Sequence, residues 1–309
     1  MHSENAVMSD RHYNIGRRAI RIADSIVDYA MLAFFLILFC AGIYVVWDSR
    51  QIYREADAKQ YEIYNPIEGQ EVSFTELQGK NPDVFGWLTI YGTNINYPLV
   101  QGEDNEEYLD KDAFGKSSTA GSLFLDYRNA KDLSDSSSIV YGHHMDKNAM
   151  FGELDQFTKK KFFDGHQYGV VYNGQRTYGV DIFAFIEADA YNTVLYTPQR
   201  DDAGREALLD EIESNALHMR EADVADGEKI LLLSTCTSDI TNGRYILAGK
   251  LTEEFHKDPF KEKTGNQKEI GEGLGISRIW FRAGLVVLFA VLIGVYAFLS
   301  RRRRKRRDE

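Results

Sequence analysis

Two stretches of this 309-residue chain contain no charged residue, and they limit where the rest of the chain can lie. Tyr29–Trp47 and Ala283–Leu299 both approach the ~20 apolar residues with which a helix crosses a bilayer. We therefore predict transmembrane helices over residues 29–47 and 280–300. The first stretch could instead be an uncleaved signal anchor, and a buried core helix is less favoured for stretches this long.

Basic residues outside the two stretches predict the orientation of the chain. Four arginines precede the first stretch, and a basic run at 301–307 follows the second. Because basic flanks stay on the cytoplasmic side, we expect both termini in the cytoplasm and residues 48–279 outside. The predicted segments are a cytoplasmic N-terminus at 1–28, a helical stalk at 48–73, a folded outer domain at 74–255, a flexible linker at 256–279 and a basic cytoplasmic tail at 301–309.

The charge of the outer portion excludes one class of partner. The whole chain has a formal net charge of −11. The predicted cytoplasmic segments carry more basic than acidic residues. The portion between the two stretches is therefore more acidic than the chain as a whole. Such a surface does not bind nucleic acid. The basic tail follows an apolar stretch directly, which favours contact with anionic membrane lipid.

The two cysteines are separated by the predicted membrane boundary. Cys40 lies within the first apolar stretch, so Cys236 is the one cysteine of the outer domain. It has no partner for an intramolecular disulfide there. An unpaired thiol in an exported domain either pairs with another chain or is used chemically. The sequence has no Cys/His spacing typical of zinc sites, and we predict no metal.

Short runs of apolar and β-branched residues predict a mostly β outer domain. Turns rich in Gly, Asn and Asp separate the runs, a spacing typical of an antiparallel barrel or sandwich. The predicted strands, about eight, cover residues 87–91, 95–100, 122–126, 138–141, 168–172, 177–185, 230–235 and 245–251. Two helical segments are predicted between them, at 148–163 and at 201–221, the second from the helical spacing of Leu208, Ile212, Ala216 and Met219.

The last two predicted strands bring a thiol next to a cation. Cys236 ends the run that begins at Ile230, and Arg244 begins the next run after a polar loop at 237–243. In a hairpin of that register the two residues lie side by side. A nearby cation favours the thiolate, which is the nucleophilic form of cysteine. Asp239 in the loop could orient a neighbour or cap the turn.

A histidine at a third strand end is the candidate proton donor and acceptor. His143 follows the predicted strand 138–141, where active-site residues often project, and His144 would point to the other face. The acidic residues at 103–112 could bind calcium, but they lack a complete loop spacing. A solvated acidic surface is the favoured interpretation for them.

Several motifs occur in an order that resembles the class B sortases. They are Asn81-Pro-Asp-Val-Phe-Gly-Trp-Leu-Thr-Ile-Tyr-Gly-Thr-Asn-Ile-Asn-Tyr-Pro-Leu-Val-Gln, then Asp104-Asn with Tyr108-Leu, Gly121-Ser-Leu-Phe-Leu-Asp-Tyr-Arg-Asn129, Tyr141-Gly-His-His-Met with Met150-Phe-Gly-Glu-Leu, and Leu233-Ser-Thr-Cys with Arg244. The resemblance runs from about Phe74 to Leu251, most of the outer domain. It implies a sortase-type eight-stranded β-barrel with N-terminal helices and a helix between the sixth and seventh strands.

The resemblance also implies a reaction and the residues that perform it. Cys236 would be the nucleophile, His143 the general acid and base, and Arg244 the group that stabilises the oxyanion. Ser234 and Thr235 could contact substrate, or could be ordinary strand residues. The implied substrates are surface proteins with a C-terminal sorting signal, which the enzyme cleaves at a Thr–Gly-type bond through a thioacyl intermediate. No cofactor is implied.

The acceptor amine stays open at this level. The first interpretation is an amine of the cell-wall (peptidoglycan) precursor. The second apolar stretch departs from the usual class B arrangement and resembles that of pilus-building members, so a pilin lysine is the alternative. The sequence has no clear Asp-Pro-aromatic lid motif, which disfavours a class C pilin polymerase. Two further interpretations of the domain are a plain cysteine hydrolase and a non-enzymatic surface-binding module.

Overall fold

In the computed structural model, the chain forms two compact units. One comprises residues 1–50 and 269–309, and the other comprises residues 51–268. The predicted loop with Asp239, the tail and most of the linker lie outside the residues that the structure describes. The described residues are 2–69, 71–221, 224–225, 227–236, 242–261, 284, 286–287, 289–294 and 296.

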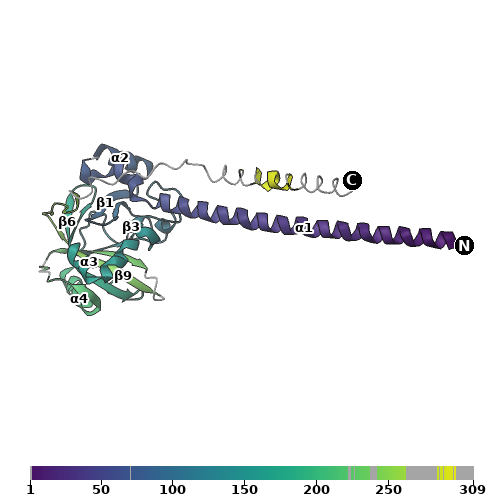
Figure 1. Cartoon of the computed structure of the whole chain (residues 1–309). Coiled ribbons are helices and arrows are strands. Elements are labelled where there is room, and N and C mark those ends of the chain that lie inside the picture. The colour runs from purple at the N-terminus through teal and green to yellow at the C-terminus, as the bar shows by residue number, and fades with distance from the viewer. Residues whose placement is uncertain are drawn as a thin grey trace. The chain divides into compact units, whose positions relative to one another are not determined.

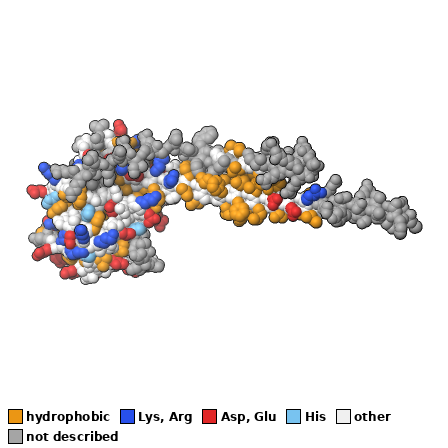
Figure 2. Space-filling model, in the orientation of Figure 1, with side chains coloured by type: hydrophobic (Ala, Val, Ile, Leu, Met, Phe, Trp, Pro, Cys, Tyr) orange, Lys and Arg blue, Asp and Glu red, His pale blue; other side chains and the backbone are white. Residues whose placement is uncertain are grey.

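The chain begins with one uninterrupted helix, α1 (His2–Glu55), which contains the first apolar stretch (Figure 1). Its apolar side chains lie on the surface, as Figure 2 shows, and Phe34 and Phe35 are 56% and 58% exposed. A core helix would bury such side chains, whereas a membrane anchor or a signal sequence would not. Among the described residues, α1 is the one helix with the length and apolar content to cross a membrane.

The second apolar stretch is described only in part. Its described residues between 284 and 296 are helical. Within the same unit, the ring of Tyr296 meets the ring of Tyr29 edge-on, with the ring centroids 5.1 Å apart. The two apolar stretches therefore touch each other, and the second membrane crossing stays a prediction.

Eight strands form a closed ring in the second unit. Their order is β5, β1, β2, β3, β4, β8, β9, β6, and β6 pairs with β5 to close the ring. Each predicted strand is present, and the closure confirms a barrel in place of an open sandwich. The strands are β1 (Val84–Ile90), β2 (Asn96–Val100), β3 (Leu123–Leu125), β4 (Ser137–Tyr141), β5 (Tyr168–Tyr172), β6 (Thr177–Asp189), β8 (Lys229–Cys236) and β9 (Gly243–Thr252).

One short strand lies outside the ring, in a segment for which the sequence predicts a helix. β7 (Ala216–Met219) pairs with β6, where Phe185 is in register with His218. Leu217 and Met219 are exposed. The helical spacing of Ala216 and Met219 is therefore misleading, because their backbone completes the edge of β6.

The helix that precedes β7 is correspondingly shorter than predicted. α4 (Asp202–Asn215) begins after Asp201, whose side chain accepts the N–H of Gly204 at 2.8 Å and caps the helix. It ends at Asn215 in place of residue 221. It does lie between the sixth and seventh strands of the ring, as the resemblance implies.

The apolar run of β8 is buried on both faces, which explains why it does not alternate. Leu231 and Leu233 belong to the core inside the barrel. Ile230 and Leu232 belong to a second core, which α4 covers with Leu208 and Ile212. The strand therefore separates an inner face from an outer face that carries α4.

Residues predicted as part of a stalk pack against the barrel. The segment after α1 consists of η1 (Ala58–Tyr64) and η2 (Pro66–Glu68), two 3-10 helices, followed by α2 (Glu71–Lys80). Tyr61 and Tyr64 are buried in the inner core, and the centroid of the Tyr61 ring lies 5.1 Å from that of Phe114. This segment is part of the folded domain.

The single helix predicted over residues 148–163 is replaced by three short pieces. They are η4 (Asp146–Asn148), η5 (Gly152–Thr158) and α3 (Lys160–Gly165). Met150 has a φ of 52°, which a right-handed helix cannot contain. Gly152 lies so close to the carbonyl of Met145 that any side chain there would collide with it. The backbone therefore turns sharply directly after β4.

The described part of the predicted linker is packed on the barrel. The ring of His256 stacks on Tyr168 with centroids 3.8 Å apart, and the ring of Phe260 lies parallel to His166 at 5.0 Å. Residues 256–261 therefore form a fixed strap in place of a flexible segment.

Replacing Tyr61 tests whether the segment after α1 is part of the core. Tyr61→Ala should lower the free energy of unfolding by about 3 kcal/mol, because a buried aromatic side chain is removed. Ile63→Ala is the matched control on the same 3-10 helix, since Ile63 is 64% exposed. Urea unfolding of the detergent-solubilised chain, followed by tryptophan fluorescence, measures both. Equal effects of the two substitutions would contradict the assignment.

Candidate active site

Three predicted catalytic positions meet at one end of three adjacent strands. β4 runs parallel to β8, and Tyr141 is in register with Ser234. His143 and Cys236 each lie two residues further along, so the continued register brings these two positions together. β9 runs antiparallel to β8, and there Arg244 is the partner of Cys236. The backbone alone brings His143, Cys236 and Arg244 to one edge of the barrel.

A main-chain carbonyl holds the ring of His143. Its Nε2 lies 2.8 Å from the carbonyl oxygen of Leu109, the last residue of η3 (Glu107–Leu109). Because a carbonyl only accepts, Nε2 donates, and Nδ1 is the ring nitrogen outside this bond. The carbonyl of His143 accepts the N–H of Phe151 at 3.1 Å. Ring and backbone are both fixed, while the side chain stays half-exposed.

The other described histidines of this unit are engaged elsewhere. His144 directs its Nε2 to Oδ2 of Asp155 at 2.6 Å, away from the strand end. The remaining ones contact backbone or rings: His166 the carbonyl of Phe162, His218 the carbonyl of Thr158 and His256 the ring of Tyr168. Their positions leave His143 as the histidine next to position 236.

Arg244 is half-buried at the start of β9. Its Nη1 donates to the carbonyl of Gly243 at 2.9 Å. Among the described residues, no Asp or Glu forms an ion pair with it. A guanidinium in this situation keeps further N–H donors for a carbonyl or an oxyanion. The preceding residue, Gly243, lines a groove of about 330 Å³ together with the end of β6, the end of α4 and β7.

The two hydroxyl residues before position 236 face opposite sides of β8. Ser234 continues the outer positions Ile230 and Leu232, and its Oγ lies 2.9 Å from the hydroxyl of Tyr196. Thr235 continues the inner positions of the strand. Both are buried, at 2% and 3% exposure. Both side chains are covered, but Thr235 faces the interior of the barrel, whereas Ser234 lies on the outer face beneath Tyr196.

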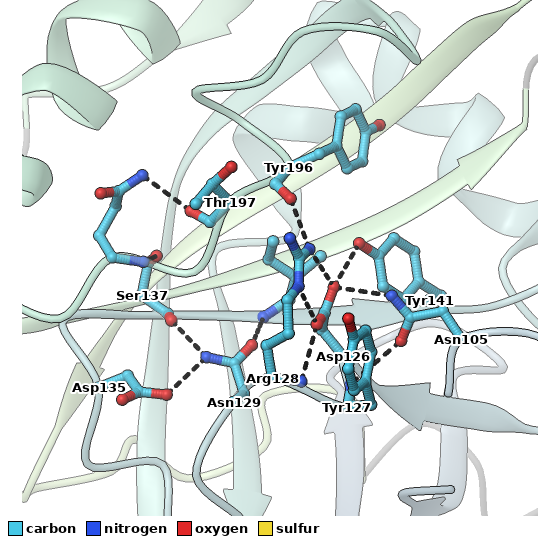
Figure 3. A network of polar contacts seen from close by, with 12 residues as sticks. Asn105, Asp126, Tyr127, Arg128, Asn129, Asp135, Ser137, Tyr141, Tyr196 and Thr197 are labelled. Carbon is cyan, nitrogen blue, oxygen red and sulfur yellow. Dashed lines mark hydrogen bonds and ion pairs between the residues drawn. The ribbon is translucent and has the colours of Figure 1, made fainter. Parts of the chain in front are cut away.

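A buried carboxylate lies close to this outer face (Figure 3). It belongs to the motif at residues 121–129, but the motif alone assigns it no role. Asp126 follows β3, and its side chain is fully buried. Arg128 binds it in a fork, with Nε to Oδ1 at 2.8 Å and Nη2 to Oδ2 at 2.7 Å. Asn105 and the hydroxyl of Tyr141 donate to Oδ2 as well.

These contacts set the charge of the cluster. Burial acts to raise the pKa of Asp126, but the hydrogen bonds from Arg128, Asn105 and Tyr141 outweigh it, so the pKa lies below its ordinary value. Burial and the neighbouring carboxylate raise the pKa of Tyr141. At neutral pH the cluster therefore holds an ionised Asp126 and a neutral Tyr141.

The acidic residues at 103–112 cap turns. Asp104 Oδ1 accepts the N–H groups of Glu106 and Glu107. Asp112 Oδ1 accepts those of Phe114 and Lys116. Within the part of the chain that the structure describes, no three His, Cys, Asp or Glu side chains lie together as metal ligands would.

Comparison with known proteins finds one family. The model of the sortase domain matches residues 88–252. Sortase B of Listeria monocytogenes is 35% identical over 180 residues, which cover 57% of this chain and 72% of that protein.

Two solved structures are similar as well. A Streptococcus pyogenes class B sortase involved in pilus biogenesis is 38% identical, with a TM-score of 0.55, and the match covers 59% of this chain and 99% of that one. Sortase B from the type II pilus of Streptococcus pneumoniae is 41% identical, with a TM-score of 0.51, and the match covers 58% of this chain and 98% of that one.

Gly121 provides a test of how His143 is seated. Its φ is 63°, and an added Cβ would lie 2.8 Å from the carbonyl oxygens of Tyr108 and Leu109 and 3.0 Å from the ring of His143. Gly121→Ala should therefore displace the ring and lower kcat by about 100-fold. Gly165→Ala is the control, because nothing lies within 4 Å of its added Cβ. Unchanged kcat in the Gly121 variant would show that the contact of the His143 ring with the Leu109 carbonyl is not needed.

Acid unfolding tests the charge of Asp126. Because its pKa is lowered in the folded state, its contribution to stability is present above the unfolded value of ~3.9 and is lost as the pH falls through the folded value. The free energy of unfolding should therefore fall less steeply below about pH 4 in Asp126→Asn than in the unsubstituted protein. Asp164→Asn, which removes the exposed partner of Lys160, should keep the original steepness. Urea unfolding at a series of pH values measures the slopes.

Proposed function

The chain belongs to the class B sortases, which are cysteine transpeptidases, and from this premise we propose that Cys236, His143 and Arg244 are its catalytic residues. The observation that carries the proposal is the register of β4, β8 and β9, which puts the three positions at one strand edge. On the same face, Tyr196 is the proposed substrate contact, and Ser234 beneath it holds its hydroxyl.

The proposed reaction has two halves. The thiolate of Cys236 attacks the carbonyl carbon of a Thr–Gly-type bond in a sorting signal, and the carbonyl electron pair moves to oxygen. Arg244 donates hydrogen bonds to that oxyanion. As the C–N bond breaks, His143 gives a proton to the leaving amine, and a thioester forms on Cys236. An incoming amine attacks the thioester, His143 takes its proton, and the thiolate leaves as the new amide forms.

The proposed setting is the outer face of the cell membrane. α1 serves as the anchor, with the second apolar stretch as a further crossing, and the barrel acts on surface proteins outside. The exposed apolar surface of α1 supports this proposal, since a water-soluble domain would bury it.

Two acceptor amines are candidates. The first is an amine of the cell-wall precursor, which the resemblance to class B sortases implies. The second is a lysine of a pilin subunit. The second is favoured by the two similar solved structures, whose descriptions name pilus biogenesis and a pilus.

A transfer assay tests the proposal and separates the acceptors. The full chain in detergent is mixed with a panel of sorting-signal peptides that contain a Thr–Gly-type bond. Mass spectrometry should find a thioester on Cys236. An added amine should then release the bound acyl group as an amide. Release by a peptide with a free lysine would support the pilin acceptor, and release by a peptide with a glycine amine would support the cell-wall acceptor. Hydrolysed product with every amine would favour a hydrolase, and no adduct with any peptide would contradict the proposed residues.

Two adjacent histidines supply the matched control. His143→Ala should lower kcat by at least about 100-fold, because the proton donor and acceptor is lost. His144→Ala removes the partner of Asp155 and should keep most of the activity at equal folded concentration. Cys236→Ala should form no thioester. Equal loss in both histidine variants would contradict the assignment of His143.

A further inference from the structure

The loop between β6 and α4 lies over β4 and β8 next to the proposed catalytic edge. Its residue Tyr196 places the hydroxyl 2.9 Å from Oγ of Ser234, two positions before Cys236. The ring of Tyr196 stacks on that of Tyr141, with an interplanar angle of 15° and centroids 6.3 Å apart. The loop therefore forms a wall over the outer face of β8, two residues before Cys236.

Two sets of contacts hold this wall, one from Ser137 of β4 and one from Arg128 after β3. Near its end, the N–H of Gln199 donates to Oγ of Ser137 at 2.7 Å, and the N–H of Ser137 donates to the carbonyl of Gln199 at 3.0 Å. In its middle, Nη2 of Arg128 donates to the carbonyl of Tyr196 at 2.7 Å. Figure 3 shows this second contact reaching up from the Asp126 cluster to the loop.

Arg128 connects a buried charge to a main-chain carbonyl of the wall. Its fork is fixed by Asp126, whose side chain is fully buried, while its own side chain is 35% exposed. A planar guanidinium can bind both carboxylate oxygens and a third acceptor at once. A lysine ammonium would keep the charge but lose this geometry. Neutralising Asp126 would need only a nearby positive charge. The three directed bonds of Arg128 also fix the position of the Tyr196 carbonyl.

We propose that Arg128 is a positioning residue: held by Asp126, it fixes Tyr196 against Ser234 and so sets the position of the wall against which the sorting-signal peptide binds. This inference rests on the proposed function and names a residue outside the catalytic three. Arg128 touches neither the thiol nor the reacting bond in this scheme. Its effect is on binding of the peptide, because it acts through the wall.

The test compares the effect of a substitution on KM with its effect on kcat. In the full chain, Arg128→Lys should raise KM for a cleaved sorting-signal peptide by about tenfold and leave kcat within about threefold, because a shifted wall weakens binding without removing a reacting group. The rate at which iodoacetamide alkylates Cys236, measured on its peptide by mass spectrometry, should stay unchanged. Arg176→Lys is the matched control, since Arg176 contacts Tyr178 and Glu253 and lies with Lys229 at the beginning of β8, the end opposite Ser234.

A second variant and their combination keep the test decisive. Tyr196→Phe removes the hydroxyl that contacts Ser234, keeps the carbonyl that accepts from Arg128, and should raise KM in the same direction. If Arg128 acts through this wall, the double variant should raise KM less than the product of the two single effects. Unchanged KM in either single variant, or multiplying effects, would overturn the inference. An unsubstituted chain that cleaves no peptide and forms no adduct would instead contradict the proposed function.

Discussion

The parallel pairing of β4 with β8 is the constraint from which the rest of the site follows. Parallel neighbours end at the same edge, so Tyr141 opposite Ser234 carries His143 and Cys236 out of the barrel together. A parallel pair also cannot be joined by a tight turn. The chain between β4 and β8 therefore makes a long excursion that contains β5, β6, α4 and β7. The loop beside the proposed catalytic edge is part of this excursion.

Burial on both faces holds β8, the strand of the proposed nucleophile, in place. Leu231 and Leu233 fill the barrel, and Ile230 and Leu232 fill the space beneath α4, so β8 is held from two sides. After the first residue, Lys229, the next polar residue of β8 is Ser234, where the outer core ends. An ion pair with a buried carboxylate adds little net stability, because desolvating the charge costs about as much as the attraction returns. The Asp126–Arg128 pair is better understood as a specifier of loop geometry than as a source of stability.

Patterns local in sequence were enough to predict the strands of the ring. They also place Cys236, His143 and Arg244 at strand ends, because alternation and turn residues mark where strands stop. Pairing partners that lie far apart leave no such mark. Arg128 and Tyr196 lie 68 positions apart in the sequence. No local periodicity around either residue indicates that the two are in contact. β7 was missed for the same reason, since its partner β6 decides that residues 216–219 are extended.

The ends of the barrel unit bear on the proposal of two membrane crossings. Two anchors in one membrane require that the outer domain begin and end on the same side. Lys261, at the end of the strap, pairs with Glu68 of η2 at 3.1 Å, close in sequence to the end of α1. An exposed ion pair alone would not hold the strap, but the stacks of Phe260 on His166 and of His256 on Tyr168 hold it against the barrel as well. The last described residue of the strap therefore lies beside η2, thirteen residues after the end of α1 in the sequence, and the strap ends near the start of the same unit.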